Sequence, residues 1–171
     1  SALSVKSSVD NSFSKVFNSV GSSIKKYSLD LVNKGSYVYS DNNNSFSLMM
    51  LVAFLFASRN TRVAILDARK TLQDLMSFDK TVKAQAEARL ESAKKEQVLI
   101  LVNLGFEYRS SKMRDLYISP LLSDRCKKGM ITFASSKVSK DDLIKAYASD
   151  ELAKKVLKSS FEKLFKEEFI N

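Results

Sequence analysis

VKAQAEARLESAKKEQVLILVNL, residues 82–104, is the stretch on which the expected fold class depends most. Its first half, Ala84 to Glu96, consists largely of residues that favour helix. Asp79 precedes it as a helix N-cap, and Gly105 follows as a stop. The second half is the apolar run Val98 to Val102. We therefore expect one long helix that passes from an exposed, charged part to a buried part and connects two subdomains.

Other segments carry an apolar residue at every third or fourth position, the spacing of an amphipathic helix. FSLMMLVAFLFASR, residues 46–59, is apolar nearly all round and is expected at the centre of a bundle, after a linker at residues 36–45. Ser139 to Asp142 resembles a capping box, and Asp150 stands at the start of a last helix. The expected apolar stripes are Val5, Val9, Phe13, Val16, Phe17, Val20, Ile24, Tyr27 and Leu31; Val63, Leu66, Leu72, Leu75 and Met76; and Leu152, Val156, Phe161, Leu164, Phe165 and Phe169.

Glycine and proline are scarce, with four and one in 171 residues, which is few for a protein built from strands and tight turns. This scarcity favours long helices. We expect an all-α fold of six to eight helices in two small packed helical subdomains, residues 1–92 and 93–171.

The residue types exclude several kinds of chemistry. The chain has no histidine and one cysteine, Cys126, which rules out Cys/His zinc sites, catalytic triads and an internal disulfide, and favours a reducing compartment. It also lacks the glycine-rich phosphate loops G-x-x-x-x-G-K-[ST] and G-x-G-x-x-G. The carboxylate pairs at 141–142, 150–151 and 167–168 fall at expected helix starts or exposed ends. We expect no enzyme, no cofactor and no metal site.

The apolar segment Ser47 to Ala57 is the one candidate for a membrane span. It is too short, because a spanning helix needs about 20 apolar residues. The first residues also lack the continuous apolar region of a signal peptide. We expect a soluble chain with no membrane insertion.

Positive charge is concentrated in two windows. The net charge is +9, of which residues 109–140 carry +6, from eight cations and two acids, and residues 59–70 carry +3. Clustered cations of this kind favour a polyanionic partner. Tyr108 lies directly before Arg109, and an aromatic ring beside a guanidinium group suits unpaired bases. If the two windows fold onto one face, that face would bind phosphates.

The chain resembles the small RNA-silencing suppressors of closteroviruses (the beet yellows type). The resemblance is carried by residues 1–20 (SALSVKSSVDNSFSKVFNSV), 47–59 (SLMMLVAFLFASR) and 103–120 (NLGFEYRSSKMRDLYISP). It implies an all-α homo-oligomer that closes into a ring in the host cytoplasm. Such a ring would bind double- and single-stranded RNA without sequence preference and sequester small RNAs. The implied RNA-binding residues, with Tyr108, are Arg59, Arg62, Arg69, Arg109, Lys112, Arg114, Arg125, Lys127 and Lys128.

Two alternatives remain open on the sequence. The first keeps RNA as the partner, as in a viral replicase accessory subunit or a nucleocapsid-type protein. The second is a helical interaction module whose basic face meets an acidic protein or membrane surface.

Overall fold

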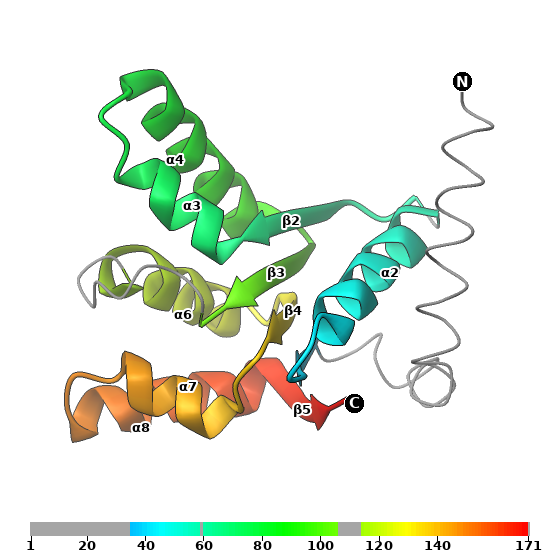
Figure 1. Ribbon diagram of the computed structural model, residues 1–171, viewed down its shortest axis with the longest axis vertical. Helices are drawn as coiled ribbons and strands as arrows, with labels where there is room; N and C mark the ends of the chain where they lie inside the picture. Colours follow the sequence, from blue (N-terminus) through cyan, green and yellow to red (C-terminus); the bar gives the residue numbers. More distant parts are fainter. Residues whose placement is uncertain (1–34, 59, 106–113, 171) are drawn as a thin grey trace.

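The structure is a computed structural model that describes residues 35–58, 60–105 and 114–170 (Figure 1). The expected N-terminal stripe, Arg59, Tyr108, Arg109 and Lys112 lie outside the described residues. The described elements are, in chain order, β1 (Gly35–Tyr39), α2 (Asn44–Ser58), β2 (Val63–Asp67), α3 (Ala68–Leu75), α4 (Lys80–Lys95), β3 (Val98–Leu104), a π-helical turn η2 (Arg114–Ile118), α6 (Ser119–Lys127), β4 (Ile131–Ser136), α7 (Lys140–Tyr147), α8 (Glu151–Leu164) and β5 (Phe165–Phe169).

The five strands form one sheet in the order β2-β3-β4-β1-β5, and every neighbouring pair is parallel. The expected all-α fold of two helical subdomains is therefore wrong, and the fold is α/β. The strands also come from both sides of the subdomain boundary expected at residue 92, since β3 pairs with β2 in the same sheet.

The stretch at 82–104 shows where the helical interpretation fails. α4 ends at Lys95, and Val98–Leu104 is β3, in the interior of the sheet between β2 and β4. All its residues except Asn103 are buried. A strand buried on both faces reads as a continuous apolar run, and periodicity cannot distinguish such a run from a buried helix.

The other four strands were also missed. β1 occupies part of the expected linker, β2 lies in an expected helix, β4 lies in a segment to which no element was assigned, and β5 follows α8 directly where one continuous helix was expected. The scarcity of glycine was a misleading signal, because the crossover connections of a parallel sheet are made by helices. These helices begin here with serine and aspartate caps, which require no glycine.

The helices are divided unequally between the two faces of the sheet (Figure 1). Of the helices that the structure describes, only α2 covers one face, where Leu48 and Met49 pack with Val98, Ile100 and Phe133. α3, α4, α6, α7 and α8 cover the other face, in a second core that includes Leu99 and Leu101 of β3. Successive residues of β3 thus point to opposite layers.

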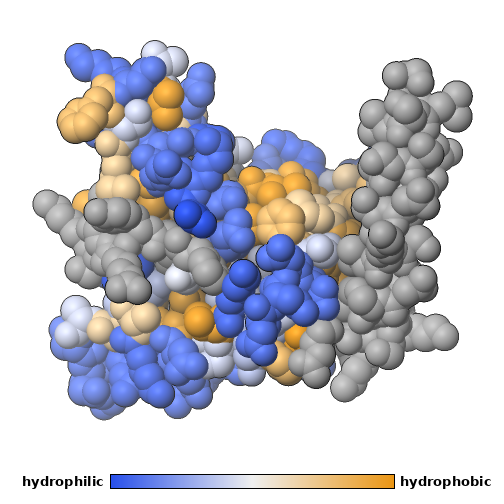
Figure 2. Space-filling model, in the orientation of Figure 1, coloured by the Kyte–Doolittle hydropathy of each residue, from blue (hydrophilic) through white to orange (hydrophobic). Residues whose placement is uncertain are grey.

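α2 was expected to be buried all round, and it is not. Phe54 and Leu55 are 54% and 43% exposed, and Figure 2 shows apolar residues at the surface in this part of the molecule. Within the part of the chain that the structure describes, no helix is long and apolar enough to cross a membrane.

Three of the predicted helix starts are confirmed. Asp79 caps α4, Ser139 caps α7 and Asp150 caps α8, each through a side-chain oxygen that accepts from backbone N–H groups. Gly105 ends β3 rather than a helix, with a φ of 89° that glycine adopts without strain.

Candidate functional site

In an open parallel sheet, ligands bind beyond the carboxyl ends of the strands, where neighbouring strands send their connections to opposite faces. That point lies here between β1 and β4. β1 continues into α2 on one face, whereas β4 continues into α7 on the other. A small pocket opens at this edge, lined by Asn42, Asn43, Ser45, Phe46, Asn103, Ser135, Ser136 and Lys137.

The loop from β1 to α2, residues 40–43, satisfies the helix N-terminus with its own side chains. The backbone N–H of Ser45 donates to Ser40 Oγ at 3.0 Å, and that of Asn44 donates to Asn42 Oδ1 at 2.8 Å. Free N–H groups at a helix start are what an anion would bind. In this chain, two of these N–H groups, those of Asn44 and Ser45, already donate to side chains of the loop.

A phosphate-binding loop between a strand and a helix requires glycines, a lysine and a hydroxyl residue. With Ser45 at the hydroxyl position, Asn44 stands at the lysine position and Asn43 at the second glycine position. The Ser45 hydroxyl is buried and donates to the backbone oxygen of Ser136 at 3.0 Å, which joins α2 to β4. The glycine and lysine that would bind a triphosphate are thus replaced by asparagines, and the hydroxyl is used in a hydrogen bond within the protein.

The size and charge of the pocket agree with this closed arrangement. Its volume is about 10 Å³, which holds about one water molecule. Among the described residues that line it there is no carboxylate, the ligand type that holds Mg²⁺ beside phosphates. A magnesium–nucleotide complex does not fit this site.

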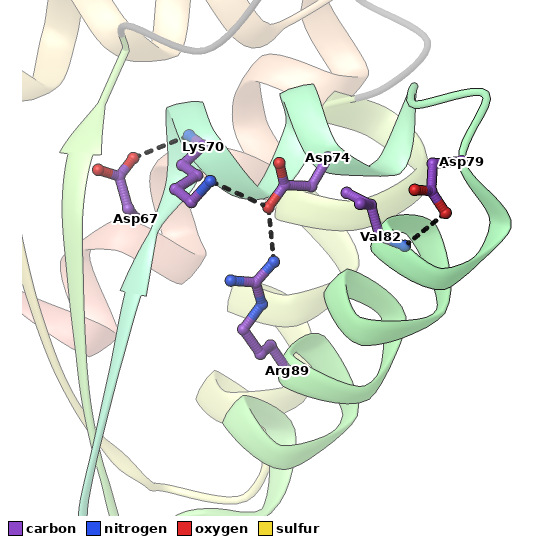
Figure 3. A network of polar contacts seen from close by, with 6 residues as sticks. All are labelled: Asp67, Lys70, Asp74, Asp79, Val82 and Arg89. Atoms are coloured by element: carbon purple, nitrogen blue, oxygen red, sulfur yellow. Dashed lines mark hydrogen bonds and ion pairs between the residues drawn. The ribbon is translucent and has the colours of Figure 1, made fainter.

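Asp67, at the carboxyl end of β2, uses both carboxylate oxygens in hydrogen bonds that stabilise the fold. One of its oxygens accepts from the backbone N–H of Lys70 at 2.9 Å, which caps α3, and the other accepts from Asn103 Nδ2 at 2.8 Å. Figure 3 shows the same helix tied to α4, with Asp74 contacted by Lys70 Nζ at 3.5 Å and by Arg89 at 2.6 Å. These carboxylates organise the α3–α4 pair.

Arg62 and Arg69, which belong to the same basic window of residues 59–70, lie at opposite ends of β2. Arg62 precedes β2 and pairs with Glu96 at 2.8 Å, whereas Arg69 follows β2 at the other edge of the sheet. The five residues of β2 separate the two ends of the strand by about 16 Å. Arg114 donates to the backbone oxygen of Ala146 and lies 4.9 Å from the centre of the Tyr147 ring.

Arg125 has a structural role in the core. Its side chain is fully buried, and the guanidinium donates to Thr132 Oγ1 and to the backbone oxygens of Ala93, Glu96 and Ile131 at 2.7–2.8 Å. Burial lowers its pKa to about 10, so it stays protonated at neutral pH. It cannot reach a nucleic-acid phosphate. Lys127 and Lys128, at the end of the same helix, are exposed.

Residues 36–45 were expected to be a linker, so Ser40, Asn42 and Ser45 were not among the predicted site residues. The pattern that could have found them is a short β-branched and aromatic run, then a cluster of serine, aspartate and asparagine, then a helix. That pattern is a strand, a loop and a helix.

No protein-family model matches this chain, and no curated protein is significantly similar to it in sequence. Solved structures do match. DnaI has a TM-score of 0.68 at 23% identity, over 81% of this chain and 70% of that chain. The DnaC helicase loader has a TM-score of 0.60 at 18% identity, over 81% and 79%. The replication initiator DnaA, bound to AMPPCP and single-stranded DNA, has a TM-score of 0.61 at 16% identity, over 81% and 40%.

These likenesses overturn the resemblance to closterovirus suppressors, and with it the expected silencing suppression and small-RNA partners. The matching structures include a helicase loader and a replication initiator bound to single-stranded DNA, and the fold of this chain is α/β rather than all-α. At these identities the likeness establishes the fold alone: the chain has an α/β fold similar to that of DnaI, DnaC and DnaA.

Proposed function

We propose that this chain is a DNA-replication factor of the helicase-loader or initiator type that acts by binding DNA, without hydrolysing nucleotide. The observation that carries the proposal is a combination. The chain has a fold similar to that of these replication proteins, yet its β1–α2 loop has no glycine, no lysine and no free hydroxyl.

The loop chemistry argues against hydrolysis. In P-loop enzymes the loop backbone and its lysine hold the phosphates, and Mg²⁺ is held by a loop hydroxyl and an aspartate. Here the equivalent hydroxyl of Ser45 is bonded to Ser136, and the described residues around the pocket include no carboxylate. A triphosphate would have to break the bonds that start α2 before it could enter.

DNA is the binding partner that charge and fold favour together. DnaA, which shares the fold, is bound to single-stranded DNA in its solved structure. This chain carries a net charge of +9, and phosphate contacts supply most of the affinity of non-specific DNA binding.

Two measurements test the proposal. A fluorescent ATP analogue with Mg²⁺ should show no saturable binding, and phosphate release should stay at background. A labelled single-stranded oligonucleotide should bind at low salt and dissociate as salt rises. Turnover that disappears in Ser45→Ala would overturn the non-hydrolysing role. Absence of DNA binding at low salt would overturn the DNA-binding role.

A further inference from the structure

We infer that the groove between α6 and α8 binds the sugar–phosphate backbone of single-stranded DNA. The inference rests on the proposed DNA-binding function and names its site. The groove has a volume of about 350 Å³ and is lined by Ser123, Cys126, Lys127, Lys155, Val156, Ser159, Ser160 and Lys163.

The groove is built from one face of each helix. α6 contributes positions 123, 126 and 127, and α8 contributes 155, 156, 159, 160 and 163, spacings that place each set on a single helical face. Beneath the groove, Leu121 and Leu122 of α6 and Leu157 and Phe161 of α8 are buried in the core. The two walls are therefore held by packing, and the groove does not depend on a loop.

Its charge is positive and uncompensated. Lys127, Lys155 and Lys163 are exposed, and none of them forms an ion pair with another residue of the described chain. By contrast, Lys154, on the same helix, lies 3.6 Å from Glu151. Among the described residues that line the groove there is no aspartate or glutamate. An anion can therefore approach these ammonium groups without first displacing a protein carboxylate.

The uncharged lining also favours a phosphate backbone. Three serine hydroxyls stand between the lysines, and lysine and serine are common donors to phosphate oxygens. Among the described lining residues none is aromatic, so bases would not stack in the groove, and binding would show little sequence preference. Lys155 and Lys163 are eight residues apart, about 12 Å along the helix axis, which allows contact with more than one phosphate.

A strand of DNA fits this surface better than an acidic protein segment does. The hydroxyl donors suit the densely spaced oxygens of phosphates, and the lining offers one exposed apolar side chain, Val156, to a protein partner. A single strand can lay its backbone into a groove of this size, whereas a duplex presents a wide convex surface.

The first test compares two double variants on α8. Lys155→Ala with Lys163→Ala removes two groove lysines, and Lys154→Ala with Lys158→Ala removes two lysines outside the lining. Binding of a fluorescein-labelled oligothymidylate is measured by anisotropy across about 50–200 mM salt. Single strands give a salt slope of about 0.7 per phosphate contact, so the groove variant should lose about 1.4 from the slope. When the salt concentration rises fourfold, the affinity of the groove variant should therefore fall by a factor roughly seven times smaller than the factor for the wild type.

The second test uses Cys126, the only cysteine of the chain, which is free and half-buried in the groove. Bound oligothymidylate should slow its alkylation by N-ethylmaleimide in the wild-type protein. This readout requires no substitution, so it holds even if a variant folds poorly.

The outcomes separate the two proposals. If wild type binds DNA but both double variants behave alike, and alkylation is not slowed, the groove assignment is wrong while the DNA-binding function stands. If wild type binds no DNA, the proposed function itself fails. If polyglutamate of equal charge displaces the oligonucleotide as well as unlabelled oligothymidylate does, the groove is a surface for acidic proteins and the DNA assignment is overturned.

Discussion

Arg125→Met should be among the most destabilising single substitutions in the described chain. Arg125 joins three elements: its own helix α6, the carboxyl end of α4 through Ala93 and Glu96, and the start of β4 through Ile131 and Thr132. The carbonyls at the end of α4 have no partner within their helix, and a guanidinium group is well suited to satisfy them. Methionine fills the space of the stem but donates nothing.

The magnitude follows from the acceptors left behind. Three backbone oxygens and one hydroxyl lose their donor; the acceptors of Ala93 and Thr132 are buried and those of Glu96 and Ile131 are partly buried, and each buried group left unsatisfied costs about 1–3 kcal/mol. The variant no longer buries a charge, and so avoids the desolvation that lowers the pKa of Arg125 to about 10. The loss of unfolding free energy is therefore smaller than the summed cost of the four acceptors. We expect a net loss of about 3–5 kcal/mol, typical of removing one partner from a buried charged network.

The assay is urea unfolding followed by circular dichroism, with thermal unfolding beside it. For a chain of this length the expected loss lowers Tm by on the order of 10 °C. Lys128→Met removes an exposed cation at the end of the same helix and should stay within about 0.5 kcal/mol of wild type. Arg125→Met within about 1 kcal/mol of wild type would show that the buried guanidinium contributes little and refute the reasoning.

Three further outcomes are expected. Gly35→Ala should destabilise the β1–β4 pair by about 3 kcal/mol or more in the same unfolding assay, because the new Cβ would lie 1.5 Å from the backbone oxygen of Thr132; an unchanged urea midpoint would contradict this. Asp150→Ala should cost about 1 kcal/mol by losing the N-cap of α8, and Asp150→Asn should retain most of it. Lys94 donates a hydrogen bond that holds the pKa of Glu91 below its usual value, so an NMR titration should show that pKa rising in Lys94→Ala. Because the folded pKa is lowered, the small stabilisation from this pair is present at neutral pH and lost as the pH falls through that pKa.

The helix starts could be predicted from the sequence because their signals are local. Asp79, Ser139 and Asp150 each accept hydrogen bonds from backbone N–H groups two or three residues ahead, and such bonds depend on no distant part of the chain. The charged run of residues 84–95 favours helix for the same local reason.

The strands could not be predicted in the same way. Val98–Leu104 is apolar throughout, and whether such a run becomes a helix or a strand depends on its neighbours, here β2 and β4, which lie more than twenty residues away on either side. The candidate site could not be predicted from the sequence for the same reason. Ser45 acquires its role from Ser136, 91 residues away.

The sequence by itself determined which groups are available: no histidine, one cysteine, no phosphate-binding loop motif, an excess of nine positive charges and helix caps at their correct positions. Only the tertiary structure decided how those groups are used. It placed Arg125 in the core and Lys127 in an exposed groove two residues further on, and it brought Lys155 and Lys163 beside Lys127. The physical reason is that burial and charge pairing depend on which elements pack together, and that packing joins segments that local residue patterns cannot connect.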